Sequence, residues 1–585
     1  MAVCNYGFQP FLRGFPQVPV QIYHVAKTIK NSPVRLLDAF VDRVFEFVDQ
    51  PLLPSQSNFA PVEEIDEAVL VSSVEGSIPY DFPEGIYIRN GPNPLFGGLK
   101  STVSMFGRSS HTWIEGEGML HSLNFNKDSD GSWTISYNNR HVQTETLKLE
   151  KERKKPSFLP ALEGDSPAIL SAYLLNLLRF GDVNKHISNT NIFEHSGKFY
   201  SIAENHVPQE IDIFTLETLG NWDVSGAWNR PFTSHPKKAP GTGELVMMGF
   251  DAQKPYFELG VISDLVCRYN VIIDFPVVID INRLIGGGPL MKYDKKGYAR
   301  IGVMPRYGDA DSIQWFEVEP SSVFHIFNCF EDGDEVVMWA CKARGSVIPG
   351  PDLGLNKYEW FSRGYMHMNS VEDNGDNMTQ DGIFFSRAHE WRLNMKTTEV
   401  KERNLTGTKF SMEFPMINEN FIGSKNKFGY AQVVDSIASS SSGRAKYGGL
   451  AKLYFEEPEN GLSWELNKLI KVEYHSFPEN TFCSGATFVP KVGGLEEDDG
   501  WIITFVHNEN TNMSQASYFT TINQCLCRLL YYCRVLQICL TLFLQVYIVD
   551  TKNISSEPVA KITLPGRVPY GFHGAFMSVS SQLED

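Results

Sequence analysis

Three histidines in similar surroundings are the residues of this sequence best suited to chemistry. His235 follows Pro-Phe-Thr-Ser, His325 lies within Val-Phe-His-Ile-Phe, and His573 lies between a phenylalanine and a glycine. A histidine taken alone is more often a core residue than a ligand, but neutral imidazole is also the commonest metal ligand. The three lie far apart in sequence, unlike the close ligand pairs of a zinc finger. Together they predict a metal at the centre of a large β architecture, with one ligand from each of several sheets.

Repeated hairpins would supply the strands that carry these ligands. Residues 210–219, 390–400 and 546–562 each combine an alternating strand, a polar turn with threonine and a second strand. From Asn58 onward the chain reads mostly as short strands and turns, and a reused hairpin unit is typical of a β-propeller. One strand from each blade faces the axis of a propeller, so distant histidines can meet there. The predicted fold class is therefore all-β, and residues 436–449 are predicted to form a flexible surface loop.

The N-terminal region is predicted to differ from the rest. Residues 1–31 are acid-poor and mildly basic, which indicates an organelle transit segment or, alternatively, a disordered tail. Residues 32–57 are predicted as an amphipathic helix and a linker, with Ser32-Pro33 starting a helix that extends to Asp49. This helix either lies on a membrane surface or packs on the main domain. A second apolar helix, near residues 168–180, has the same two interpretations.

Composition narrows the class of protein. The 585 residues carry a formal net charge of −17, which argues against a nucleic-acid partner. Nine cysteines, four of them within one unusual segment, do not form a disulfide framework, so a reducing compartment is expected. The sequence has no convincing run of uncharged apolar residues long enough to span a bilayer.

Several motifs show a resemblance to a known family. They are Arg89-Asn-Gly-Pro-Asn-Pro, His111-Thr-Trp-Ile-Glu-Gly-Glu-Gly-Met-Leu-His121, Ala203-Glu-Asn-His-Val-Pro, His235-Pro-Lys, Glu413-Phe-Pro and Val568-Pro-Tyr-Gly-Phe-His573-Gly. With these motifs the chain resembles the plant carotenoid cleavage dioxygenases from Phe59 to Met577. Within that family it looks closest to the branch that includes zaxinone synthase.

The resemblance implies a fold, a cofactor and a reaction. The fold would be a seven-bladed β-propeller over residues 58–585, with a helical cap over the metal face. Iron(II) on the axis would be held by four histidines, three of them supported by glutamates. Residues His235, His325 and His573 match three of the iron ligands, and Glu204 and Glu413 match two of the glutamates. A glutamate that accepts the Nδ1 proton of a ligand histidine fixes its tautomer and aims Nε2 at the metal.

The implied reaction is O₂-dependent cleavage of a C=C bond of a carotenoid or apocarotenoid into two carbonyl products. Because such a substrate offers the metal no chelating group, an apolar tunnel would bind it. The two apolar helices make peripheral membrane association a candidate property. The plastid is the expected location, because carotenoids are made there and the N-terminal residues are acid-poor, with the cytoplasm as the alternative.

The chain departs from the family pattern in its ligands. The sequence has no histidine between His235 and His325, where the resemblance places the fourth ligand, expected near residues 264–268. Gly485 stands at the position of the third glutamate, and Glu479 is a nearby candidate to replace it. These departures predict an impaired enzyme or, alternatively, an inactive propeller that binds an apolar isoprenoid or a protein partner. A propeller glycosidase ranks last, because no motif places two carboxylates at a catalytic separation.

A second departure is an insertion at residues 516–545. This segment holds four cysteines and no acidic residue, and it interrupts what otherwise reads as one hairpin. Its composition fits neither flanking region, which favours translated intron sequence over a membrane-dipping hairpin.

Overall fold

The computed structural model describes most of the chain between residues 32 and 578. The described residues are 3–4, 32–65, 67–96, 99–228, 230–238, 243–250, 257–262, 268–279, 285–286, 291–294, 297–343, 384–458, 469–510 and 544–578. The predicted transit segment or tail, apart from residues 3–4, lies outside them. So do residues 264–267, where a ligand was expected, and the predicted insertion up to residue 543.

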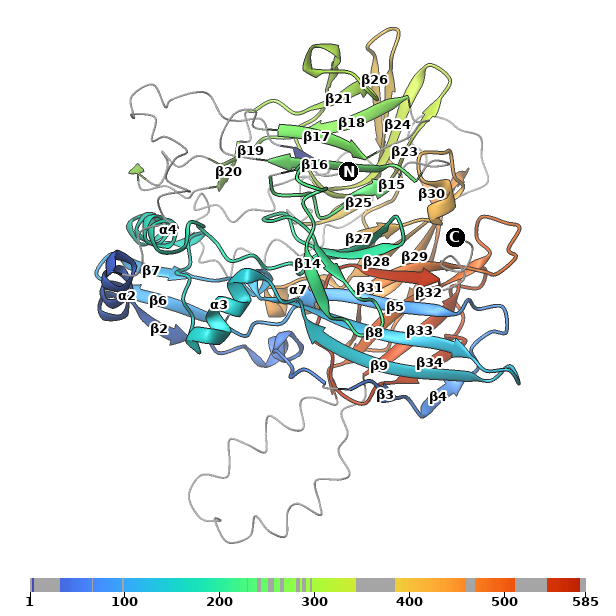
Figure 1. The fold of residues 1–585 in the computed structure, drawn as a ribbon. Helices are drawn as coiled ribbons and strands as arrows, with labels where there is room; N and C mark the ends of the chain where they lie inside the picture. The colour runs from blue at the N-terminus through green and yellow to red at the C-terminus, as the bar shows by residue number, and fades with distance from the viewer. Residues whose placement is uncertain are drawn as a thin grey trace, which may run out of the picture.

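The described part of the chain is mostly β and is built from antiparallel sheets (Figure 1). One sheet joins both ends of this part and contains β35 (Gly574–Ser578), β5 (Gly85–Pro92), β8 (Gly118–Lys127), β9 (Trp133–His141) and β3 (Val69–Leu70). The next contains β11 (Asn191–His195), β12 (Lys198–Ile202), β13 (Gln209–Ile211) and β14 (Thr218–Asn221). A third contains β15 (Lys237–Lys238), β16 (Leu245–Phe250) and β17 (Phe257–Ile262).

The remaining sheets follow in chain order. The fourth contains β18 (Tyr269–Asp274), β21 (Arg300–Pro305) and β22 (Gln314–Glu317), with β1 (Val3–Cys4) parallel to β18. The fifth contains β23 (Ser322–Asp332), β24 (Glu335–Ala343), β25 (Ser386–Asn394) and β26 (Val400–Asn404). The largest contains β27 (Ser411–Met416), β28 (Phe428–Val434), β29 (Tyr447–Pro458), β30 (Ile470–Ser476), β31 (Thr481–Pro490), β32 (Gly500–Asn508), β33 (Gln545–Asp550), β34 (Ala560–Thr563) and β4 (Ser73–Gly76). Its two halves meet at a single residue pair between β29 and β31. Strands β19 (Val277–Ile279) and β20 (Met291–Tyr293) form a separate pair.

The hydrophobic core lies between sheets rather than in one central layer. Buried clusters join β5 and β8 to β11–β13, β12 to β16, and β18 and β21 to β24 and β25. Further clusters join β23 and β24 to β28 and β29, β28 and β29 to β31–β33, and β32 and β33 back to β5, β8 and β9. The sheets that these clusters join therefore pack face to face, as the apolar alternation of their strands requires.

The three predicted hairpins are confirmed. Strands β13 and β14, β25 and β26, and β33 and β34 each form an antiparallel pair around the polar turn that the sequence indicated. Strand β33 also pairs directly with β32, with Val506 opposite Gln545. Gln545, the last residue of the predicted insertion, is therefore the first residue of β33.

Two local predictions were wrong. The first helix, α2 (Ser32–Val44), ends five residues before Asp49, because Glu46–Asp49 form strand β2, which pairs with β6. Residues 436–449 are not a loop: they form helix α7 (Ser436–Ser442) and the start of β29. The carboxylate of Asp435 accepts a hydrogen bond from the backbone N–H of Ala438 and so caps α7.

The longer helices gather beside a small sheet at one side of the β body (Figure 1). This sheet contains β2 (Glu46–Asp49), β6 (Lys100–Ser104), β7 (Gly107–Ser110) and β10 (Glu163–Gly164), and the helices are α2, α3 (Glu145–Arg153) and α4 (Ser166–Phe180). The inner faces of α2 and α4 share a buried apolar cluster that includes Val41 and Ala172. Short 3-10 turns are η1 (Pro54–Phe59), η2 (Trp113–Glu115), η3 (Ala310–Ser312) and η5 (Glu419–Phe421). Within the described residues no helix combines the length and the apolar character needed to cross a membrane.

Candidate metal centre

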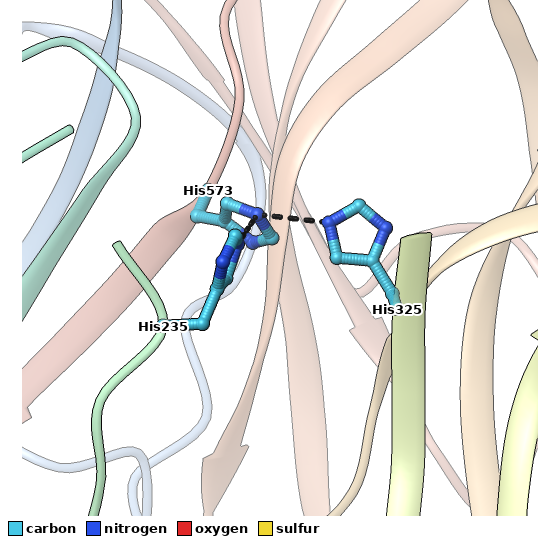
Figure 2. A group of neighbouring side chains, drawn as sticks. All are labelled: His235, His325 and His573. Atoms are coloured by element: carbon cyan, nitrogen blue, oxygen red, sulfur yellow. Dashed lines mark hydrogen bonds between the residues drawn. The ribbon is translucent and has the colours of Figure 1, made fainter. Parts of the chain in front are cut away.

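The three histidines predicted as ligands come together in the structure. One ring nitrogen from each of His235, His325 and His573 lies within 4.8 Å of those of the other two. The Nε2 atom of His573 is 2.8 Å from Nε2 of His235 and 3.2 Å from Nε2 of His325. Figure 2 shows the three rings turned toward one another from three separate segments of the chain.

A strand irregularity and a close backbone approach position two of these rings. His325 lies on β23 where the pairing with β24 shifts register between Val323 and Ile326, and such a bulge redirects the side chain it contains. His573 directly precedes β35, which runs very close to β31. A Cβ at Gly574 would lie only 2.0 Å from the carbonyl oxygen of Gly485, so only glycine permits this approach.

Two of the imidazoles, those of His235 and His573, are neutral at neutral pH. Burial lowers the pKa of His235 well below its usual value, and the neighbouring rings of His573 and His325 lower it further. Burial, with His325 second, lowers the pKa of His573 in the same way. Neutral imidazole offers a lone pair to a metal without first losing a proton.

His325 is held by a carboxylate. Its Nδ1 lies 2.8 Å from Oε2 of Glu413, and both side chains are largely buried, with 17% and 12% exposure. Glu413 lies on β27 at a second register shift, and the next residue, Phe414, has a positive φ of 52°. This strained turn places the ring of Phe414 4.7 Å from that of His325 and 4.9 Å from that of His573, between ring centroids.

His235 reaches its glutamate through a hydroxyl. The Oγ atom of Ser234 donates to Oε1 of Glu204 and lies 2.8 Å from Nδ1 of His235. The direct separation between Nδ1 of His235 and Oε1 of Glu204 is 3.6 Å. Glu204 therefore makes no close contact with the ring of His235, and its side chain is 56% exposed.

The donor set fits a divalent transition metal. Nitrogen ligands about 2.1 Å from a metal lie roughly 3 Å from each other when they occupy adjacent positions. The two Nε2–Nε2 distances, 2.8 and 3.2 Å, bracket that value. Imidazole ligands suit iron, zinc, copper and nickel alike, so the ligand type alone does not choose among them.

A comparison with protein families identifies the family of this chain. The family model described as retinal pigment epithelial membrane protein (RPE65) matches residues 59–523 and 543–578. The chain belongs to this family of carotenoid oxygenases. The prediction of family membership is confirmed. The prediction that the chain is a dioxygenase by class is confirmed with it.

Two members of the carotenoid oxygenases match this chain over most of their own length. The carotenoid 9,10(9',10')-cleavage dioxygenase 1 of Pisum sativum is 29% identical over 95% of this chain and 95% of its own. The chloroplastic 9-cis-epoxycarotenoid dioxygenase NCED1 of Oryza sativa is 26% identical over 94% of this chain and 80% of its own. Among solved structures, the lignostilbene dioxygenase of Pseudomonas brassicacearum has a TM-score of 0.65 at 19% identity, covering 91% of this chain and all of that one. The similarity to the lignostilbene dioxygenase concerns the fold of the chain alone.

Two residues that matter to this site were not found from the sequence. Ser234 directly precedes His235, and a hydroxyl beside a candidate ligand is the signal that could have found it. Phe414 follows Glu413 in a motif already singled out, but its positive φ cannot be read from sequence.

In the described part of the chain, no third glutamate forms an ion pair with a ligand histidine. A Cβ at Gly485 would lie 2.5 Å from Cγ of Arg89, so a larger side chain has no room there. Glu479, the candidate replacement, lies in an exposed turn before β31. Among the described residues, no carboxylate forms an ion pair with His573.

Proposed function

We propose that this carotenoid oxygenase is a non-haem iron(II) dioxygenase that cleaves a C=C bond of a carotenoid or apocarotenoid into two carbonyl products. The observation that carries the proposal is the convergence of three imidazoles on one point, in a chain that belongs to this family. His235, His325 and His573 would hold the iron, and Glu413 and Glu204 would support two of these ligands. Iron bound there would supply the activation of O₂.

Apolar rings next to the histidines support a polyene substrate. Phe414 packs on two of the imidazoles, and Phe324, 48% exposed, lies beside His325. Rings in these positions would limit the access of water to a bound metal and would offer apolar surface to a substrate that has no group to chelate it. Because the sequence looks closest to the branch that includes zaxinone synthase, we expect the substrate to be an apocarotenoid.

The arrangement of sheets supports a seven-bladed propeller. If the large sheet is divided at the single pair between β29 and β31, seven sheets follow one another along the chain. Buried clusters join six of the seven neighbouring pairs, including the last sheet to the first. We assign the cap to α2, α3, α4 and the small sheet beside them (Figure 1).

The seventh pair of neighbouring sheets, those of β16 and β18, supports the proposal that a segment of the chain is missing. Between the sheets of β16 and β18, the described residues contribute no apolar cluster of this kind; a buried ion pair between Arg306 and Glu244 bridges them, with Nη2 and Oε2 2.8 Å apart. The chain between these sheets is where the fourth histidine was expected. We infer that this blade lacks its histidine-bearing strand and that iron binding is impaired. The alternative is an inactive propeller that binds an apolar isoprenoid or a protein partner.

The direct pairing of β32 with β33 supports an insertion after β32. An intervening segment that leaves one hairpin intact on both sides fits translated intron sequence better than a membrane hairpin. The transcript tests this interpretation: a complementary DNA that retains the segment in most messages would contradict it.

The exposed faces of α2 and α4 support peripheral membrane association. Leu36 and Phe40 on α2 are 73% and 42% exposed, and Leu178 on α4 is 63% exposed. The acidic residues of α2 do not oppose a membrane strongly, because Asp38 pairs with Arg179 and Asp42 with Lys155. We place the protein in the plastid, where its carotenoid substrates are made, with the cytoplasm as the alternative.

Iron content and O₂-dependent cleavage test the proposed function. Both are measured on this chain and on a version with the missing histidine-bearing strand restored and residues 516–545 removed. If only the repaired chain binds iron and cleaves apocarotenoids, the ligand set needs its fourth histidine. Activity of the unrepaired chain would show that three histidines suffice. If neither chain turns over, the binding-module alternative replaces the enzyme.

A further inference from the structure

We propose that Ser234 is a positioning residue that relays the carboxylate of Glu204 to the metal ligand His235. This inference rests on the proposed function, because it assigns a role at the same centre. The two other ligands differ: His325 contacts its own glutamate directly, at 2.8 Å, and His573 forms no carboxylate pair among the described residues. Each ligand is therefore held in a different way.

The inference follows from the single proton that the hydroxyl of Ser234 carries. A serine hydroxyl carries one proton, and an ionised carboxylate can only accept. Because Oγ of Ser234 donates its proton to Glu204, it has only lone pairs left for Nδ1 of His235, 2.8 Å away. Nδ1 must then carry the ring proton of His235. The Nε2 lone pair, which faces His573, is thereby left free for a metal.

The serine is fixed well enough to perform this role. Ser234 is fully buried. Its carbonyl oxygen accepts a hydrogen bond from Nδ2 of Asn191 at 2.9 Å, and the N–H of His235 donates to Oγ1 of Thr233 at 3.2 Å. The direct distance of 3.6 Å from Nδ1 of His235 to Glu204 is too long for a good hydrogen bond, so the hydroxyl is the shorter path.

A double-mutant cycle on the full chain tests the relay. Cobalt(II) affinity is measured for the wild type, Ser234→Ala, Glu204→Gln and the double variant. Outer partners of ligand histidines typically contribute about 10- to 100-fold in metal affinity. We expect each single variant to weaken binding by about 10-fold, and the double variant to be no weaker than the weaker single. Ser439→Ala, which removes another fully buried serine hydroxyl, is the matched control and should leave affinity unchanged.

Two results of the cycle would overturn the relay. Either Ser234→Ala binds cobalt within about twofold of wild type while Glu204→Gln is strongly weakened, or the two losses add. The first result would mean that Glu204 acts on His235 directly. The second would mean that the two side chains act independently.

The tautomer of His235 provides a second measurement that needs no metal. Selective ¹⁵N labelling of histidine should show the ring of His235 protonated at Nδ1, with its signal identified by loss in His235→Gln. Ser234→Ala should remove this preference. An unchanged tautomer in Ser234→Ala, or a proton on Nε2 in the wild type, would refute the relay. If the chain binds no cobalt but the tautomer responds, the relay stands and the proposed metal function fails.

Discussion

Replacing Glu413 by glutamine should weaken metal binding by about 10- to 100-fold, the usual contribution of such partners. The carboxylate accepts the Nδ1 proton of His325 at 2.8 Å, and glutamine can keep this hydrogen bond through its amide oxygen while losing the charge. The variant therefore isolates the electrostatic part of the contact.

The magnitude follows from the geometry of the imidazole bridge. A metal about 2.1 Å beyond Nε2 would lie roughly 6.5 Å from the carboxylate, after the hydrogen bond and the width of the ring are added. A dication and a carboxylate at that separation attract by about 5 kcal/mol at an effective dielectric constant near 20. Both side chains keep some exposure, 17% and 12%, so solvent screens part of this attraction. A loss of about 1.4–2.7 kcal/mol, which corresponds to 10- to 100-fold in Kd, is the expected result.

The assay is titration of the metal-free chain with cobalt(II), followed by visible absorption. Glu64→Gln is the matched control, because Glu64 forms a similar pair with Nδ1 of His141, 3.1 Å away and outside the histidine cluster. The reasoning is refuted if Glu413→Gln binds cobalt within about twofold of wild type, or if Glu64→Gln weakens binding equally.

Three further predictions concern stability, pH and the membrane. Glu244→Gln should lower the free energy of unfolding by about 3–5 kcal/mol in denaturant titrations, since it leaves the charge of the buried guanidinium of Arg306 without its carboxylate counter-charge; a loss below about 1 kcal/mol would mean that this pair does not support the bridge between the two sheets. The hydrogen bond from His141 lowers the pKa of Glu64 to about 2, below its ordinary value of 4.5, so its stabilising contribution is complete above pH 4.5 and is lost as the pH falls through about 2. Across that window wild type should lose stability relative to Glu64→Gln in acid unfolding curves, and parallel curves would contradict the assignment. Leu178→Asp should reduce binding to anionic lipid vesicles by about 10-fold or more in co-sedimentation, because an exposed apolar side chain of α4 is removed; unchanged binding would point to another surface.

Local sequence signals identified much of the secondary structure. The hairpins β13–β14, β25–β26 and β33–β34 were predictable because alternation and turn chemistry act over a few residues. The start of α2 at Ser32 was predictable for the same reason. Its end was not, because β2 forms only by pairing with β6, some fifty residues later in the chain. Helix α7 was missed because a serine-rich composition suggests a loop, whereas Asp435 caps the segment and its hydroxyls bond to the backbone.

The sequence by itself determined which side chains are available: three histidines among β-forming residues, and Glu413 and Glu204 within recognisable motifs. Only the tertiary structure decided that they meet. His235 and His573 are 338 residues apart, and their contact requires the last strand, β35, to pair with β5 near the start of the described chain. The aim of the His325 ring depends on a strand bulge, and the path from His235 to its glutamate depends on how Ser234 is buried. These features arise from packing between distant segments, which local propensity does not encode.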